Sequence, residues 1–64
     1  MKRGDLERHL RAHGCRLIDE GGRHSRWAGP AGARSVVPRH REVDYGLARK
    51  ICSQLDVPPP SGAR

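Results

Sequence analysis

The residues best suited to chemistry surround one histidine. The stretch GGRHSRW (residues 21–27) places His24 between two arginines, after a pair of glycines and before the only tryptophan. A phosphate backbone can approach glycines closely, and the guanidinium groups of Arg23 and Arg26 can bind it. An imidazole, whose reference pKa is about 6.5, can give or take a proton near neutral pH. The pattern predicts a phosphate site with a proton-transfer group, and a purely structural histidine is the alternative.

A second basic segment follows a stretch rich in β-branched residues. Arg39, His40 and Arg41 come directly after Pro38, and we expect them to leave the last strand of the sheet that carries His24. Contact with RNA and a solvated loop are the two interpretations of this segment. The residues predicted to bind RNA are Gly22, Arg23, Arg26, Arg39, His40 and Arg41, with His24 as the catalytic candidate.

Other reactive residues lack the spacing that their chemistry needs. His9 and His13 have the i, i+4 spacing of half a metal site, but no glutamate follows the first histidine as in an HExxH motif. Cys15 and Cys52 form no CxxC pattern and are expected to be small core residues in a reducing cytosol. The carboxylates of the acidic pair at residues 19–20 diverge at adjacent strand positions. We therefore expect no metal and no small-molecule cofactor.

For His24 to contact a ligand, its side of the strand must be open, and the other side must then face the core. Side chains alternate in an extended strand, so His24, Arg26 and Ala28 point one way while Ser25 and Trp27 point the other. Trp27 is the largest apolar side chain of the sequence and is expected to face the core. This choice places His24 and Arg26 on an open face.

Apolar periodicity predicts a helix before and after three strands. Leu6 and Leu10 predict a first helix from residue 4 or 5 to residue 13, ended by a left-handed Gly14. Short strands are expected at about residues 15–20, 24–28 and 34–37, with turn signals between them. A second helix is expected after Asp44 as its N-cap. Its predicted apolar stripe consists of Leu47, Ile51 and Leu55, with Ala48 and Cys52 beside it.

The resulting order, α-β-β-β-α, is the layout of double-stranded RNA-binding domains. It predicts an α+β fold with a three-stranded antiparallel sheet and both helices on one face, so that helices and sheet share a core. The other face of the sheet would be open to a ligand. The domain is expected to span residues 1–57. The Pro-rich residues 58–64 cannot continue a helix and are expected to form a disordered tail.

Composition limits the classes of function. Sixty-four residues suffice for one small domain with a marginal core, which argues against a large closed active-site cleft. The formal net charge is +6, and residues 1–41 hold ten basic and four acidic groups, a difference of +6. This asymmetry predicts one cationic surface suited to phosphate. No apolar run is long enough for a membrane span, and the start MKRGDLERHL is charged where a signal peptide is apolar, so we expect a cytoplasmic protein.

Over roughly residues 2–57, the sequence resembles the HicA (YcfA-like) toxins of toxin-antitoxin systems. The likeness rests on a first helix ending in Gly14, a strand leading to Gly22-Arg23-His24, and an aromatic residue at Trp27. The Val37-Pro38-Arg39-His40 segment and a final helix with Leu47 and Ile51 complete it. The sequence departs from the commonest pattern at Arg23, where serine is frequent, and at Cys15, where an aromatic residue is usual.

The resemblance implies an activity, a catalytic residue and a partner. It implies a double-stranded RNA-binding-like fold that cleaves mRNA as a metal-independent endoribonuclease. His24 occupies the place of the family's catalytic histidine, in a motif of the Gly-Ser-His or Gly-Gly-Lys-His type. A HicB-like antitoxin is expected to bind the toxin and mask this site.

Two other classes of function stay open on sequence alone. A plain RNA-binding module would grip RNA with the basic face and use His24 only for hydrogen bonding. It would leave RNA intact where a nuclease shortens it. A DNA-binding protein is disfavoured because the sequence shows no helix-turn-helix pattern.

Overall fold

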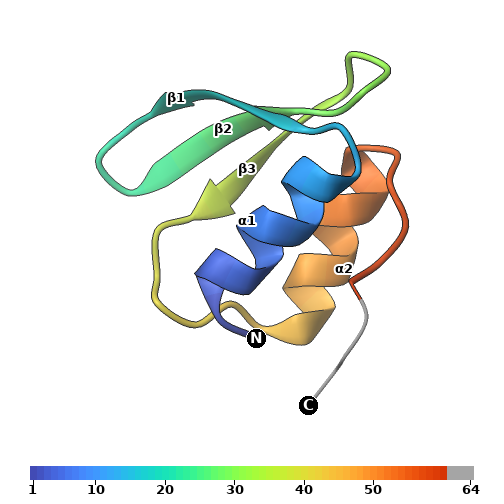
Figure 1. Cartoon of the computed structure of the whole chain (residues 1–64). Helices are drawn as coiled ribbons and strands as arrows, with labels where there is room; N and C mark the ends of the chain where they lie inside the picture. Colours follow the sequence, from blue (N-terminus) through green and yellow to red (C-terminus); the bar gives the residue numbers. More distant parts are fainter. Residues whose placement is uncertain (61–64) are drawn as a thin grey trace.

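Two helices flank three consecutive strands in the computed structural model, which describes residues 1–60 (Figure 1). The elements are α1 (Arg3–Ala12), β1 (Arg16–Glu20), β2 (His24–Ala28), β3 (Arg34–Pro38) and α2 (Tyr45–Gln54). The predicted α-β-β-β-α order is confirmed. None of the helices in the described part is long and apolar enough to cross a membrane.

The strands form one antiparallel sheet in the order β1-β2-β3, so the strand that begins with His24 is central. Between β2 and β3 the pairing is regular, with His24 opposite Pro38. Between β1 and β2 the register shifts by one residue at Ile18, which makes a β-bulge. Asp19 therefore lies opposite Arg26. A bulge reverses the side-chain alternation that follows it, and this determines where the acidic pair of β1 points.

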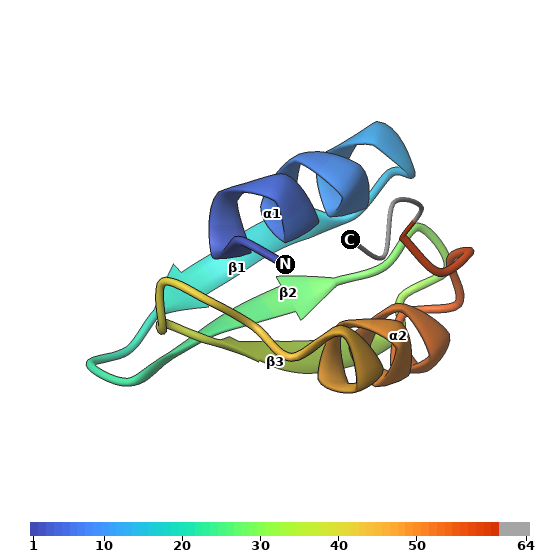
Figure 2. The same ribbon diagram turned by 90° about the horizontal axis from the view of Figure 1, so that it is seen from below.

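Both helices lie on one side of the sheet, with α1 over β1 and α2 over β3 (Figure 2). Leu6 and Leu10, one turn apart on α1, are fully buried. Gly14 follows the end of α1 and has a φ of 86°, in the left-handed region that glycine adopts readily. The predicted cap is confirmed.

The second helix buries a face slightly different from the predicted one. Asp44 caps it as expected, because its Oδ2 accepts a hydrogen bond from the Gly46 backbone N–H at 3.0 Å. Leu47, however, is 40% exposed, so its assignment to the buried stripe was wrong. The buried residues at i, i+3, i+4 and i+7 are Ala48, Ile51, Cys52 and Leu55. Since each residue turns about 100° around the helix, Leu47 falls at the edge of this face.

The core lies between the helices and the sheet. Trp27 and Val37 contribute from the strands and both are fully buried. Cys15 and Cys52 are buried as predicted, and both belong to this core. The end of α2 comes close to the turn after β2 at Gly29. A Cβ on Gly29 would lie 2.2 Å from the carbonyl oxygen of Leu55, so only glycine fits there.

The segment after α2 folds back against both helices. His9 Nε2 donates a hydrogen bond to the Pro58 carbonyl at 2.8 Å, and Tyr45 Oη donates to the Pro60 carbonyl at 2.7 Å. Pro60 is buried. Residues 58–60 are the first part of the segment that the sequence predicts to be a disordered tail, and that prediction stays a prediction. The rest of that segment, residues 61–64, lies outside the described residues.

Candidate active site

His24 begins the central strand and is exposed on the sheet face opposite the helices. The alternation predicted for β2 is observed in its first four residues, since Ser25 and Trp27 are buried whereas His24 and Arg26 are exposed. Ala28, expected on the open side with them, is buried at the end of the strand. Trp27 Nε1 donates to Ser25 Oγ at 3.2 Å, and Ser25 Oγ donates to the Val37 carbonyl at 3.4 Å. These buried bonds hold the strand that presents His24.

The turn between β1 and β2 leaves open space beside the histidine. The turn is closed by a backbone hydrogen bond, in which the Gly21 N–H donates to the His24 carbonyl at 2.7 Å. A Cβ on Gly21 would lie 3.2 Å from that carbonyl oxygen, whereas a Cβ on Gly22 would have nothing within 4 Å. The fold therefore constrains Gly21 and leaves the space at Gly22 free for a ligand.

Two surface pockets meet at His24. The face pocket, of about 320 Å³, lies on the open sheet face and is lined by Asp19, Gly21, Gly22, Arg23, His24, Arg26 and Val36. The edge pocket, of about 460 Å³, lies at the end of the sheet and is lined by Gly22, Arg23, His24, Arg39 and His40. Both pockets share Gly22, Arg23 and His24. A ligand can therefore reach the imidazole from either side.

Arg26 is held by a carboxylate within the face pocket. Its Nε donates to Asp19 Oδ1 at 3.0 Å, and its Nη2 donates to Asp19 Oδ2. The hydrogen bond and the charge of Arg26 lower the pKa of Asp19, and Asp19 in turn raises the pKa of Arg26. A phosphate must compete with Asp19 for this predicted RNA-binding residue. Sequence reasoning missed the pair because the bulge at Ile18 places Asp19 opposite Arg26.

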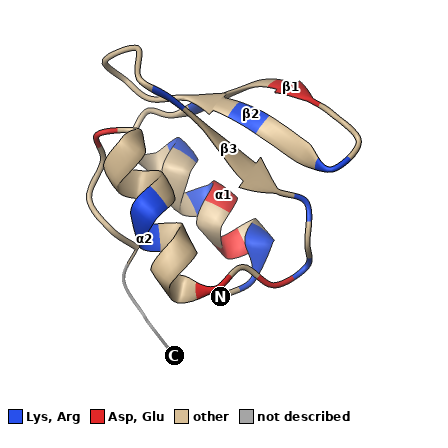
Figure 3. Cartoon of the chain, turned by 180° about the vertical axis from the view of Figure 1, so that it is seen from behind, with Lys and Arg blue, Asp and Glu red and all other residues tan. Residues whose placement is uncertain are grey.

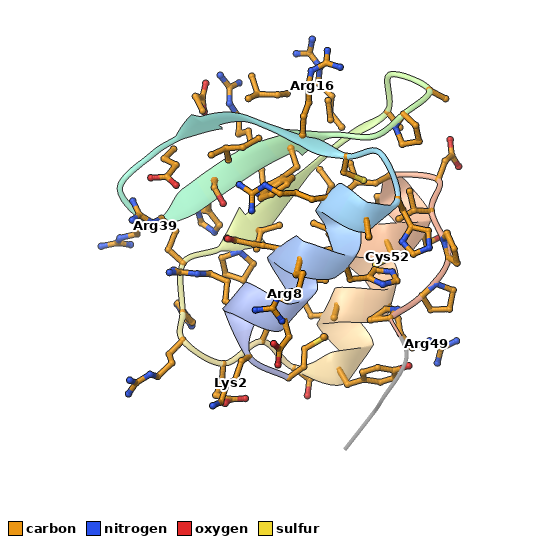
Figure 4. The ribbon with its side chains drawn as sticks, viewed as in Figure 1. Lys2, Arg8, Arg16, Arg39, Arg49 and Cys52 are labelled. Atoms are coloured by element: carbon orange, nitrogen blue, oxygen red, sulfur yellow. The ribbon has the colours of Figure 1, made fainter. Side chains whose placement is uncertain are left out.

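Arg39 ties the segment after β3 to the turn before β2. Its Nη1 donates to the Gly21 carbonyl at 3.0 Å, and its Nη2 lies 3.8 Å from Glu20 Oε1. Its backbone N–H donates to the Arg23 carbonyl at 3.0 Å. Figure 4 shows Arg39 beside this turn. Arg39 thus shapes the edge pocket that it also lines.

Arg41, unlike the other predicted RNA-binding residues, lines neither pocket at His24. It lies in a third hollow, the basic pocket, of about 560 Å³. Its lining residues are Lys2, Arg3, Gly4, Asp5, Arg8, Arg39 and Arg41. Figure 3 shows basic residues at the start of α1 and on the segment after β3.

Backbone pairing builds the basic pocket from residues far apart in the sequence. The Arg3 N–H donates to the Arg41 carbonyl at 2.9 Å, and Lys2 forms a β-bridge with Glu42. Asp5 pairs with Arg8 at 2.9 Å. Within residues 1–60, no ion pair involves the side chain of Lys2 or Arg41. No sequence spacing indicated that Lys2 and Arg8 would join Arg39 and Arg41.

The other candidate ligands and nucleophiles are engaged in the fold. His13 Nδ1 donates to the His9 carbonyl at 3.0 Å, and His9 holds Pro58. In the part of the chain that the structure describes, no three His, Cys, Asp or Glu side chains gather as a metal site. Cys15 and Cys52 are free thiols whose pKa values are raised by burial. A raised thiol pKa keeps them neutral and poorly reactive at neutral pH.

Comparison with known proteins gives one finding about the chain. A family model described as the HicA toxin of bacterial toxin-antitoxin systems matches residues 3–57. The match contains all five elements, the turn before His24 and the segment through Arg41. No curated protein and no solved structure matches the chain.

Proposed function

We propose, on the premise that the chain belongs to the family of HicA toxins of bacterial toxin-antitoxin systems, that it arrests growth by cleaving mRNA in the cytoplasm. Family membership makes the protein the toxin of such a pair and implies an antitoxin partner. The observation that carries the nuclease proposal is the position of His24. It is exposed where two pockets meet, beside an open Gly22 and next to Arg23.

The reaction that suits this site is transfer of a phosphodiester to the neighbouring ribose hydroxyl. The 2′-oxygen loses its proton and bonds to phosphorus while the bond from phosphorus to the 5′-oxygen breaks. The departing 5′-oxygen gains a proton, so the products are a 2′,3′-cyclic phosphate and a 5′-hydroxyl. His24 takes the first proton or supplies the second, and such a group contributes about 10²- to 10⁴-fold.

The arginines supply the charge that this reaction needs. Negative charge grows on the non-bridging phosphate oxygens as the 2′-oxygen attacks. Arg23 lines both pockets and Arg39 lines the edge pocket, so either pocket offers a guanidinium to a phosphate beside His24. Donors already in place where charge develops stabilise the transition state.

A HicB-like antitoxin is the proposed partner, and we place its docking surface over the pockets at His24. The pockets are lined by exposed residues of the turn and strand ends. An acidic surface would complement their arginines and accelerate association. A bound antitoxin would then exclude RNA from His24.

Labelled mRNA incubated with the purified protein in EDTA tests the nuclease proposal. We expect fragments with cyclic phosphate ends from the parent and intact RNA from His24→Ala. His13→Ala, which removes an exposed histidine from the end of α1, is the matched control and should cleave as the parent does.

The same variants should differ in growth arrest on induction. Cleavage and arrest by His24→Ala at the parental level would disprove the role of His24. Salt-sensitive RNA binding without cleavage by the parent would favour the plain RNA-binding module, for which the basic pocket is the supporting observation.

A further inference from the structure

The edge pocket contains a second imidazole. His24 and His40 both line it, and both are exposed. The proposed cleavage requires two proton transfers on opposite sides of one phosphorus atom, one at the 2′-oxygen and one at the 5′-oxygen. A single histidine cannot occupy both sides of that phosphorus in one step. The edge pocket therefore holds two imidazoles, one for each proton transfer of the reaction.

Strand pairing brings the two histidines to the same end of the sheet. His24 lies opposite Pro38, and the bond from the Arg39 N–H to the Arg23 carbonyl continues the pairing one residue further. β3 ends at Pro38, so His40 lies two residues beyond the strand and lines the edge pocket together with His24. This pocket, of about 460 Å³, is large enough to admit a phosphate group beside both rings.

The charged groups around the pair suit a bound phosphodiester. Arg23 and Arg39 line the edge pocket, and none of its lining residues is a carboxylate. Glu20 lies 3.8 Å from Arg39, so a phosphate must compete with it for that guanidinium group. Arg23 forms no ion pair within residues 1–60, and its guanidinium group is available to the phosphate.

We propose that His40 is a second catalytic residue that works with His24 as an acid-base pair. One imidazole takes the proton of the 2′-hydroxyl as the 2′-oxygen bonds to phosphorus. The other, protonated, gives its proton to the 5′-oxygen as the bond from that oxygen to phosphorus breaks. Solvent then returns both rings to their starting states. This inference rests on the nuclease activity proposed above.

Steady-state cleavage of a labelled RNA across pH tests the pair. We expect kcat of the parent to rise and then fall with pH, since one imidazole must be neutral and the other protonated. His40→Ala should lower kcat about 10²- to 10⁴-fold and lose one limb of the profile. His40→Gln keeps a hydrogen-bonding group without proton transfer and should be equally impaired. His13→Ala is the matched control and should keep both limbs.

An RNA with sulfur in place of the leaving 5′-oxygen identifies the acid. A thiolate leaves without a proton, so the variant that lacks the acid should cleave this substrate at close to the parental rate. Recovery by either His24→Ala or His40→Ala, with the other variant still impaired, supports the pair and assigns the two roles. A lack of recovery in both variants overturns it.

Two further results overturn the proposal for His40. One is a His40→Ala or His40→Gln variant that keeps kcat and both pH limbs and changes only KM. The other is recovery of kcat by glutamine. Either result with an inactive His24→Ala leaves the nuclease proposal standing, whereas a parent that cleaves no RNA refutes the nuclease itself.

Discussion

At the residue scale, the acidic pair of β1 is divided between two arginines. Asp19 binds Arg26 in the face pocket, and Glu20 lies near Arg39 at the edge pocket. Adjacent carboxylates that diverge cannot act together, as the sequence indicated. Each instead reduces the charge of an arginine predicted to bind RNA. We expect the carboxylates to tune RNA affinity.

Asp19→Asn should tighten RNA binding, because it releases Arg26 for a phosphate. Measured in a His24→Ala background, which should keep RNA intact, the affinity should rise and its dependence on salt should steepen. Asp56→Asn, at the end of α2, changes the net charge equally and is the control. Equal effects of both substitutions would show that only net charge matters.

The same pair should give the fold a small dependence on acid. The pKa of Asp19 is lowered in the folded state, so the pair stabilises the fold above the unfolded carboxyl pKa of about 3.9. That contribution is lost as pH falls through the lower, folded pKa. Parent and Asp19→Asn should therefore differ in Tm near neutral pH and converge in acid. An unchanged difference at low pH would contradict the ion pair.

Gly22→Ala should separate stability from function. A Cβ at this position has nothing within 4 Å, and the backbone of Gly22 is not in the left-handed region. Alanine should therefore leave the fold intact or stabilise it by about 0.4–1 kcal/mol. RNA cleavage should fall because the methyl group enters the space shared by both pockets. Thermal unfolding by circular dichroism and a cleavage assay provide the two measurements, and unchanged cleavage would refute this use of Gly22.

At the element scale, the positions of the helices and strands could be predicted from sequence better than which of their side chains face the core. Alternation at Ser25 and Trp27 correctly separated the core side of β2 from the side of His24. The bulge at Ile18 carries no sequence signal of its own, so the position of Asp19 followed only from the structure. Leu47 fitted the helical period but lies just beside the face that the sheet covers.

The candidate site shows the same division. Proximity in sequence correctly placed Gly22, Arg23 and His24 together, and the expected order of strands brought Arg39 and His40 to the same sheet end. The basic pocket depends on pairing between residues 1–3 and 41–43. Such long-range pairing has no local pattern, which is why Lys2 and Arg8 were missed.

Gly29→Ala should show how tightly α2 docks on the sheet. The added Cβ would meet the Leu55 carbonyl oxygen at 2.2 Å, so the turn after β2 or the end of α2 must move. We expect a loss of about 3 kcal/mol in the free energy of unfolding, at the upper end of typical overpacking costs. Gly4→Ala on α1, where nothing lies within 4 Å, should instead stabilise the fold. Chemical denaturation measures both, and a stable Gly29→Ala would contradict the contact.

At the scale of the whole molecule, charge is arranged along a path. Arg39 lines both the edge pocket and the basic pocket, so it connects His24 to Lys2 and Arg41. Figure 4 shows Lys2 and Arg39 toward the left of the molecule and Arg49 at the right. We expect an RNA strand cut at His24 to continue across the basic pocket.

The double variant Lys2→Gln, Arg41→Gln tests this path when its affinities for a long and a short RNA are compared. In a His24→Ala background, affinity should fall for an RNA of about twelve nucleotides and stay the same for one of about four, which spans only the pockets at His24. The log-log salt slope for the longer RNA should decrease by about 1.4, at about 0.7 per lost phosphate contact. Arg49→Gln with Lys50→Gln removes the same charge from α2 and should change the slope less. Equal losses from the two double variants would refute a defined path.

The burial of Trp27 has a practical consequence for all of these experiments. It is the only tryptophan of the chain, it is fully buried, and the Arg11 guanidinium lies 4.9 Å from its ring centre. Its fluorescence should therefore report the folded core alone and shift to the red when the core opens to water. RNA held on the opposite face of β2 does not touch the indole. One spectrum can thus separate variants that unfold from variants that fold and fail to cleave.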